Sequence, residues 1–224
     1  MLGRHEAYIG VLIDDLVIKG TNEPYRMLTS RCEYRLLLRE DNADRRLCEY
    51  GHEVGLLSDE KYARYQARWA AIETEIERLR TTTVHPDEVQ AMLDACESEP
   101  LRQATKLEHL LKRPMVHYAD LLAYGFGDET LAPEVTSEVE IIIKYSGYIV
   151  KQREQVARSE KLESRRLPED IVYSDVTNLR LEARQKLEAV RPETVGQASR
   201  ISGVNPADIT ALLVWLEHHR RTAQ

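Results

Sequence analysis

Arginine residues are concentrated in one stretch near the start of the sequence. Ser30 and Glu33 have the spacing of a capping box, which predicts a helix that begins at Arg31. On this helix Arg31, Arg35 and Arg39 would recur every four residues and share one face. Such a row of guanidinium groups needs anions, either nearby carboxylates or the phosphates of a nucleic acid. From spacing alone, a solvated helix face with internal ion pairs is favoured over a phosphate-binding surface.

Apolar residues recur at three- and four-residue spacing along much of the chain, which predicts helices. The clearest runs cover residues 9–17, 62–79, 135–156 and 209–216. Ser58 is placed to cap the second of these helices, and Pro133 to open the third and longest. Thr194 is placed to cap a short helix that is expected to end with Gly203 at its C-cap. The pattern predicts an all-α fold: a helical bundle with a long helical hairpin and a small C-terminal three-helix subdomain.

The first expected helix covers residues 5–19 and ends at Gly20, which suits the left-handed conformation at a helix C-terminus. Its apolar side chains are expected to form a single face: Ile9, Leu12, Ile13, Leu16 and Val17.

Composition restricts the class of protein. The 224 residues carry a formal net charge of −7, so any contact with nucleic acid must be a local patch. Three cysteines without a C-x-x-C pair argue for a reducing compartment and against a disulfide framework or a zinc site. No apolar run approaches about 18 residues, so no membrane span is expected, and no secretory signal is recognisable. Cys32 is expected to be a small buried residue rather than a nucleophile.

Gly147 lies inside the longest expected helix, where glycine costs about 1 kcal/mol relative to alanine. This predicts that another backbone approaches the helix closely at that point. A helix contact is favoured over a binding surface built on Lys144 and Tyr148.

The last helices have the outline of a helix-turn-helix. A DNA-reading version needs polar side chains on its second helix, and this sequence offers only Asp208 and Thr210 there. A small bundle that presents an apolar surface to a protein fits better, with Trp215 as an anchor. Pro168, after a charged run, marks the expected boundary before these helices.

Three segments carry a resemblance to a known family. They read EPYRMLTSRCEYRLLLREDNADRRL at residues 23–47, KYSGYI at 144–149, and GQASRISGV at 196–204 followed by LLVWL at 212–216. The sequence resembles the FAD-dependent tRNA uridine 5-carboxymethylaminomethyl modification enzymes, also called glucose-inhibited division protein A. The resemblance covers nearly the whole chain, although Cys32 stands where the family usually has alanine. Because the family's proteins are much longer, the chain is expected to be their C-terminal third.

The resemblance implies a dimeric cytoplasmic flavoprotein that uses FAD, NADH and methylenetetrahydrofolate. With a GTPase partner it would modify the wobble uridine of certain tRNAs. The resemblance implies that catalysis and the FAD site lie outside this chain, which has no G-x-G-x-x-G fingerprint and is expected to lack turnover alone. The expected division is residues 1–20 beside the FAD-binding domain, 21–166 for tRNA binding and 167–224 for the partner.

The resemblance and the arginine spacing together predict two sets of site residues. The predicted tRNA-binding residues are Arg26, Arg31, Arg35, Arg39, Lys144 and Tyr148. The predicted partner-binding residues are Gly196, Ser199, Arg200, Ile209, Leu213, Trp215 and Leu216. The apolar stripe among the latter is expected to be longer than a three-helix unit can bury by itself. Two alternatives stay open, a helix-turn-helix DNA-binding regulator and a helical protein–protein adaptor.

Overall fold

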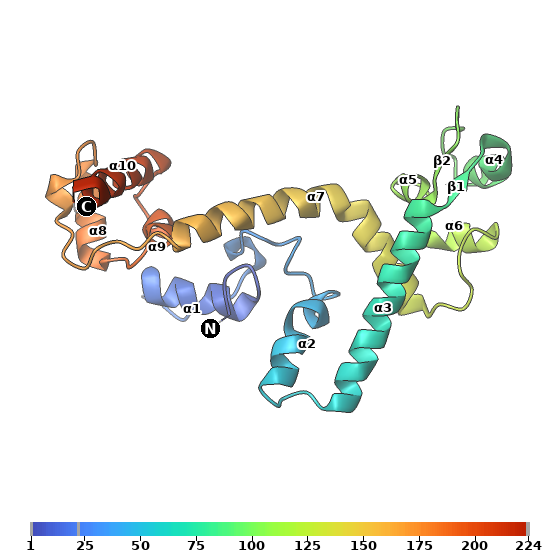
Figure 1. Cartoon of the computed structure of the whole chain (residues 1–224), viewed down its shortest axis with the longest axis horizontal. Coiled ribbons are helices and arrows are strands. Elements are labelled where there is room, and N and C mark those ends of the chain that lie inside the picture. Colours follow the sequence, from blue (N-terminus) through green and yellow to red (C-terminus); the bar gives the residue numbers. More distant parts are fainter. Residues whose placement is uncertain (1, 22, 223–224) are drawn as a thin grey trace. The chain divides into compact units, whose positions relative to one another are not determined.

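The computed structural model describes the backbone of residues 2–21 and 23–222, with side chains up to residue 219 (Figure 1). The described residues form ten α-helices, two single 3₁₀ turns and one pair of two-residue strands. The strands, β1 (Thr83–Val84) and β2 (Thr105–Lys106), are antiparallel. The predicted all-α fold is therefore confirmed.

The chain divides into two compact units. The middle unit is Arg39–Val150, and the discontinuous unit joins Met1–Leu38 to Lys151–Gln224. The longest helix, α7 (Pro133–Glu163), contributes to both. The boundaries between these units do not coincide with the expected domain boundaries at 20/21 and 166/167. The functional division expected there remains a prediction.

The middle unit begins with a helical hairpin, α2 (Ala43–Glu53) and α3 (Asp59–Thr81), which lie side by side (Figure 1). The Ser58 hydroxyl accepts a hydrogen bond from the Lys61 amide at 3.5 Å and caps α3, as the sequence predicts. The apolar run predicted over residues 62–79, here named the seam of α3, is buried in the core except for Tyr62, which is half-buried against it: Tyr65, Trp69, Ile72, Ile76 and Leu79.

Three short helices complete the middle unit, α4 (Pro86–Ala95), α5 (Leu107–Leu111) and α6 (Tyr118–Ala123). Their fully buried side chains pack with α3 and the first half of α7: Val89, Met92, Leu93, Leu107, Leu110, Leu111 and Leu121. One apolar core therefore fills this unit.

The discontinuous unit contains α1 (Tyr8–Ile18), α8 (Leu181–Val190), α9 (Val195–Arg200) and α10 (Pro206–Thr222). The predicted buried face of α1 is wrong. Its inward side chains are Val11, Asp15 and Ile18, whereas Ile9, Leu16 and Val17 are 50%, 38% and 75% exposed. This face points inward because Asp15 makes polar contacts with Arg4, Lys19 and Tyr25 inside the unit.

The apolar stripe of α10 is also not left uncovered. Ile209, Leu212 and Leu216 are at most 8% exposed, packed in a core with α8 and α9. Apolar residues of the segment before α8 also belong to this core and cover the stripe, which the three helices alone would not do: Leu167, Ile171, Tyr173, Val176 and Leu179. The predicted caps are present, since Thr194 accepts from the Gln197 amide at 3.0 Å.

Gly203 lies in the turn between α9 and α10 with a φ of +96°. The C-cap of α9 is Ile201, so the predicted C-cap at Gly203 is wrong and the glycine lies two residues beyond the observed one. Its left-handed backbone conformation is the one expected.

Candidate functional site

The arginine-rich stretch is not a helix. Residues Thr29–Arg31 make a single 3₁₀ turn, and Cys32 follows in extended conformation with φ −92° and ψ 128°. The capping box does not form because the Glu33 carboxylate binds the Arg4 guanidinium instead, at 2.8 Å. Burial then alternates, with Cys32 and Tyr34 inside and Glu33 and Arg35 outside. This two-residue period is the period of extended chain, and it overrides the local capping signal.

Residues 26–37, here named the basic strap, are tied to the second half of α7. The Tyr34 hydroxyl donates to Ser159 Oγ at 2.7 Å, and the Leu37 amide donates to Gln152 Oε1 at 3.2 Å. Beneath them Val156 packs in a small buried cluster with Cys32 and Tyr34. Burial raises the pKa of the Cys32 thiol.

The arginines of the stretch have three different environments. Arg31 lies over the Tyr25 ring at 4.6 Å. Arg26 and Arg35 are exposed and make no hydrogen bond or ion pair with any residue that the structure describes. Arg39 belongs to the middle unit, where it binds Asp41 at 2.8 Å. The predicted stripe of Arg31, Arg35 and Arg39 on one helix face is therefore wrong.

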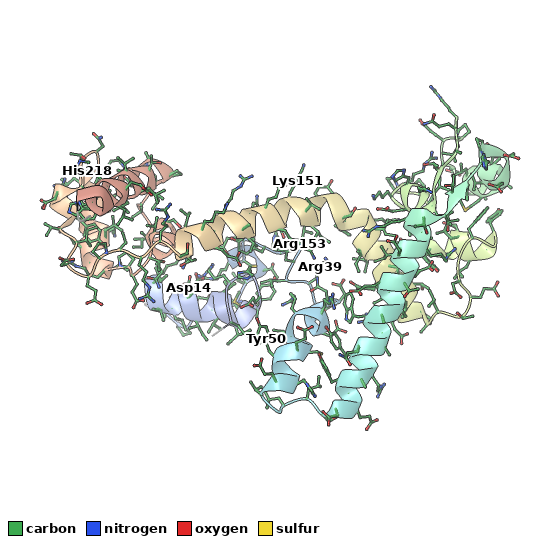
Figure 2. The ribbon with its side chains drawn as sticks, in the orientation of Figure 1. Asp14, Arg39, Tyr50, Lys151, Arg153 and His218 are labelled. Carbon is green, nitrogen blue, oxygen red and sulfur yellow. The ribbon has the colours of Figure 1, made fainter. Side chains whose placement is uncertain are left out.

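Further cations lie on α7 beside the anchor of the basic strap. Lys151 and Arg153 flank Gln152 in the sequence, and both are exposed (Figure 2). Neither is ion-paired to a residue within the described part of the chain. Together with Arg26 and Arg35 they give the discontinuous unit a group of uncompensated positive charges.

Arg39 is neutralised by two carboxylates. Its side chain is 15% exposed and also lies 3.4 Å from the buried Glu138. Burial is the main reason that the pKa of Glu138 is raised to about 7, and the charge of Asp41 raises it further. Arg39 lowers the pKa of Asp41. Glu138 is therefore the carboxyl group of this pair that takes up a proton near neutral pH, while Asp41 stays charged beside Arg39.

The predicted contact at Gly147 is wrong. A Cβ atom there would meet nothing within 4 Å. The neighbouring Tyr145 and Tyr148 are 42% and 61% exposed, and their ring centroids are 6.5 Å apart. Lys144 is paired with Glu140 at 3.0 Å.

A cleft of about 710 Å³ opens in the discontinuous unit. The N-terminal segment, α1, the basic strap, the end of α7 and α9 all line it. The predicted partner-binding residues Gly196, Ser199 and Arg200 are among the lining residues. They meet there side chains that sequence reasoning did not single out, above all Arg4 and Asp14.

Ion pairs connect the walls of this cleft. Arg4 donates to Asp14 at 2.9 Å and to Asp15 at 2.9 Å. Asp14, which projects from α1 (Figure 2), also accepts from Arg200 at 2.9 Å. Arg200 is in turn bound to Glu163 at the end of α7. Because these residues are far apart in the sequence, no local pattern signals the network.

Asp15 is the buried centre of this network. It is 2% exposed and also accepts from Lys19 at 2.9 Å and from the Tyr25 hydroxyl at 2.8 Å. Although burial opposes the charged form, these donors together lower the pKa of the Asp15 carboxyl. The side chain is therefore a charged anchor inside the unit.

The other predicted partner-binding residues lie on α10. Ile209 and Leu216 are buried in the core, whereas Leu213 and Trp215 are half-buried. Trp215 stacks on His219 with ring centroids 3.8 Å apart. On this helix Leu213 and Trp215 remain accessible to a partner.

Family models match most of the chain. Residues 59–153 match the C-terminal helical domain of the tRNA modifying enzyme MnmG/GidA, and residues 155–224 match its C-terminal helical bundle. The chain belongs to the MnmG/GidA family. The predicted resemblance is confirmed, and with it the assignment to the family's C-terminal region.

Curated relatives agree with this MnmG/GidA assignment. The tRNA uridine 5-carboxymethylaminomethyl modification enzyme MnmG of Alkaliphilus oremlandii is 52% identical over 99% of this chain and 35% of its own length. The enzyme of the same name from Geobacillus thermodenitrificans is 53% identical over 98% of this chain. The chain thus spans about a third of the length of these relatives.

A solved MnmG/GidA structure is similar as well. Aquifex aeolicus GidA in its form II crystal matches with a TM-score of 0.74 and 40% identity, over 96% of this chain and 33% of that one. This match confirms the helical fold.

The described residues do not fit the flavin dinucleotide that the family resemblance implies. Their one sheet has two antiparallel strands of two residues each, whereas a dinucleotide site of the expected type needs parallel strands and a glycine-rich turn. Within the part that the structure describes, no helix is long and apolar enough to cross a membrane.

Proposed function

We propose that this chain binds tRNA and docks the partner GTPase as part of an enzyme that installs the carboxymethylaminomethyl group on the wobble uridine of tRNA. The full-length enzyme would be a cytoplasmic homodimer that uses FAD, NADH and methylenetetrahydrofolate, and the chain by itself would lack turnover. The exposed Ile9 and Leu16 of α1 suit contact with the rest of such an enzyme.

The basic strap is the observation that carries the tRNA-binding proposal. Arg35 lies between Tyr34 and Leu37, whose hydrogen bonds fix the strap to α7, and Lys151 and Arg153 flank the anchoring Gln152. Arg26 is exposed at the start of the same strap. Guanidinium groups without carboxylate partners on a fixed backbone suit phosphate contacts. Arg39 contributes less, because it must first leave Asp41 and Glu138. Lys144 and Tyr148 belong to the middle unit, where they are proposed to contact tRNA through an exposed tyrosine on which bases can stack.

A salt titration of tRNA binding tests this proposal. Arg26→Ala, Arg31→Ala and Arg35→Ala, combined in the 224-residue chain, should weaken binding. Each lost phosphate contact should reduce the slope of log K against log salt by roughly 0.7 to 0.9. Arg64→Ala, which removes an exposed arginine of α3, is the matched control and should leave the slope unchanged. An unchanged slope in the folded triple variant would contradict the proposal.

The helix-turn-helix alternative has little support at α10. Asp208 is fully buried and bound to Arg180 at 2.6 Å, so its carboxylate is not available to a base edge. The Thr210 hydroxyl donates to the Pro206 carbonyl at 3.0 Å. A helical adaptor with no nucleic-acid role is distinguished by its failure to bind tRNA at any salt concentration.

A further inference from the structure

We infer that the cleft between α1, α7 and α9 receives a lysine or arginine side chain, flanked by apolar residues, from a protein partner. This inference rests on the docking part of the proposed function and specifies the chemistry of the contact. It concerns the discontinuous unit alone, since all the lining residues belong to it.

Charge at the cleft is distributed unevenly between its walls and its rim. The guanidinium groups are spent on internal ion pairs, and the side chains of Arg4 and Arg200 are only 10% and 16% exposed. The carboxylate side chains at the rim are more open, with Glu160 57%, Glu33 45% and Glu163 38% exposed. These carboxylates are themselves paired, Glu33 with Arg4, Glu163 with Arg200 and Glu160 with His5. The lining nevertheless holds four carboxylate side chains, with Asp14 the fourth, against two guanidinium groups. This excess of negative charge favours a cation and repels phosphate.

The remaining walls are apolar. Ile13 and Leu162 are half-buried in the lining, and Val17 at its edge is 75% exposed. The volume of about 710 Å³ is within the range of sites that enclose a ligand. A polyamine would pair with the carboxylates but would leave these apolar walls exposed to water. A basic side chain with apolar neighbours on a polypeptide satisfies both.

The acidic rim is also held in place before any ligand arrives. Glu163 accepts from the Thr194 hydroxyl at 2.8 Å and binds Arg200. A Cβ atom at residue 196 would clash with the Glu163 carboxyl group, so Gly196 makes room for it. A preorganised rim lowers the entropic cost of binding.

Two ligands test the inference on the intact 224-residue chain. The first is a fluorescent peptide, acetyl-Leu-Arg-Leu-Leu-Arg-Leu-amide, with its Glu-for-Arg counterpart as a negative probe. The second is the tRNA-modification GTPase. The binding of each ligand is measured to three chains: the unaltered chain, the Glu160→Lys variant at the rim, and the Glu154→Lys variant as control. Glu154 lies on the same helix outside the cleft and is similarly exposed, at 60%. Circular dichroism confirms that both variants fold.

Glu160→Lys should weaken binding of the Arg peptide and of the GTPase about tenfold, and Glu154→Lys less than twofold. The Glu peptide should not bind. Peptide binding with this pattern but no GTPase binding, even to the unaltered chain, would contradict the docking proposal and leave the cleft assignment standing. Equal binding by all three chains, or no peptide binding at all, would overturn the cleft assignment. If spermidine displaces the fluorescent peptide as effectively as the unlabelled peptide does, the cleft is a polyamine site, and the cleft assignment is overturned too.

Discussion

The middle unit is one continuous stretch, Arg39–Val150, whereas the discontinuous unit joins Met1–Leu38 to Lys151–Gln224. The first is filled by one apolar cluster with many fully buried leucines. The second has two separate apolar clusters, and ion pairs of Arg4 and Arg200 connect its distant segments. The unit that is discontinuous in sequence is thus the one in which charged groups hold the segments in place.

This difference has a physical basis. Apolar burial is strong but non-directional, and it suffices where neighbouring helices fold on one another. Ion pairs at fixed geometry specify which segments meet. Each unit holds one of the chain's two tryptophans, Trp69 in the middle unit and Trp215 in the discontinuous unit. Single-tryptophan variants can therefore follow the two units separately.

The largest effect is expected from Asp15→Ala. This substitution leaves Arg4, Lys19 and Tyr25 without a shared acceptor inside the discontinuous unit. We expect a loss of about 3 kcal/mol in the free energy of unfolding of that unit. The measurement is urea unfolding followed by Trp215 in a Trp69→Phe background. Asp170→Ala, at an exposed aspartate, is the control, and an equal loss in both would contradict the role of the network.

A loss of similar size, about 2 to 3 kcal/mol, is expected in the middle unit from Leu110→Ala, because the truncated side chain is fully buried. Here Trp69 reports in a Trp215→Phe background, and the transition of the discontinuous unit should not move. Leu56→Ala is the control, since Leu56 is 86% exposed. Equal shifts of both tryptophan signals would show that the two units unfold as one.

Tyr34→Phe should cost about 1 kcal/mol, because it removes the hydrogen bond from the basic strap to Ser159. Hydrogen exchange of residues 31–38 should accelerate while the middle unit stays protected. Tyr148→Phe, at an exposed tyrosine, should change neither. Unchanged exchange in Tyr34→Phe would mean that the other contacts of the strap suffice.

The smallest effect, with a sign set by pH, is expected from Glu138→Gln. The pKa of Glu138 in the folded state is about 7, above that of an unfolded carboxyl group. Its stabilising contribution is therefore full at low pH and is lost as the pH rises through 7. The glutamine variant, which stays neutral, should be more stable than the unaltered chain by about 1 kcal/mol or more at pH 8, and equal to it only below about pH 4, where an unfolded carboxyl group is also protonated. Thermal unfolding across this range tests it, with Glu134→Gln as control. A difference that does not change with pH would contradict the raised pKa.

How much could be predicted from the sequence depended on the range of the interactions. Ser58 and Thr194 cap helices where their patterns predict, and the seam of α3 is buried as its spacing requires. The long motifs at 23–47 and 196–204 were enough to identify the family. Caps, turns and helix periods depend on residues within about four positions, so the sequence alone contains them.

The candidate sites depended on contacts that no local pattern records. Ser30 and Glu33 have the spacing of a capping box, yet Tyr34 pairs with Ser159, more than a hundred residues later, and the predicted helix does not form. A short extended stretch and a single turn, closed by the Tyr34 carbonyl, take its place. Asp14 and Arg200 meet across almost the whole sequence and build the cleft. By itself the sequence determined which helices form and which family they belong to. Only the tertiary structure decided which arginines stay free and which are neutralised, because that choice depends on side chains brought together by folding.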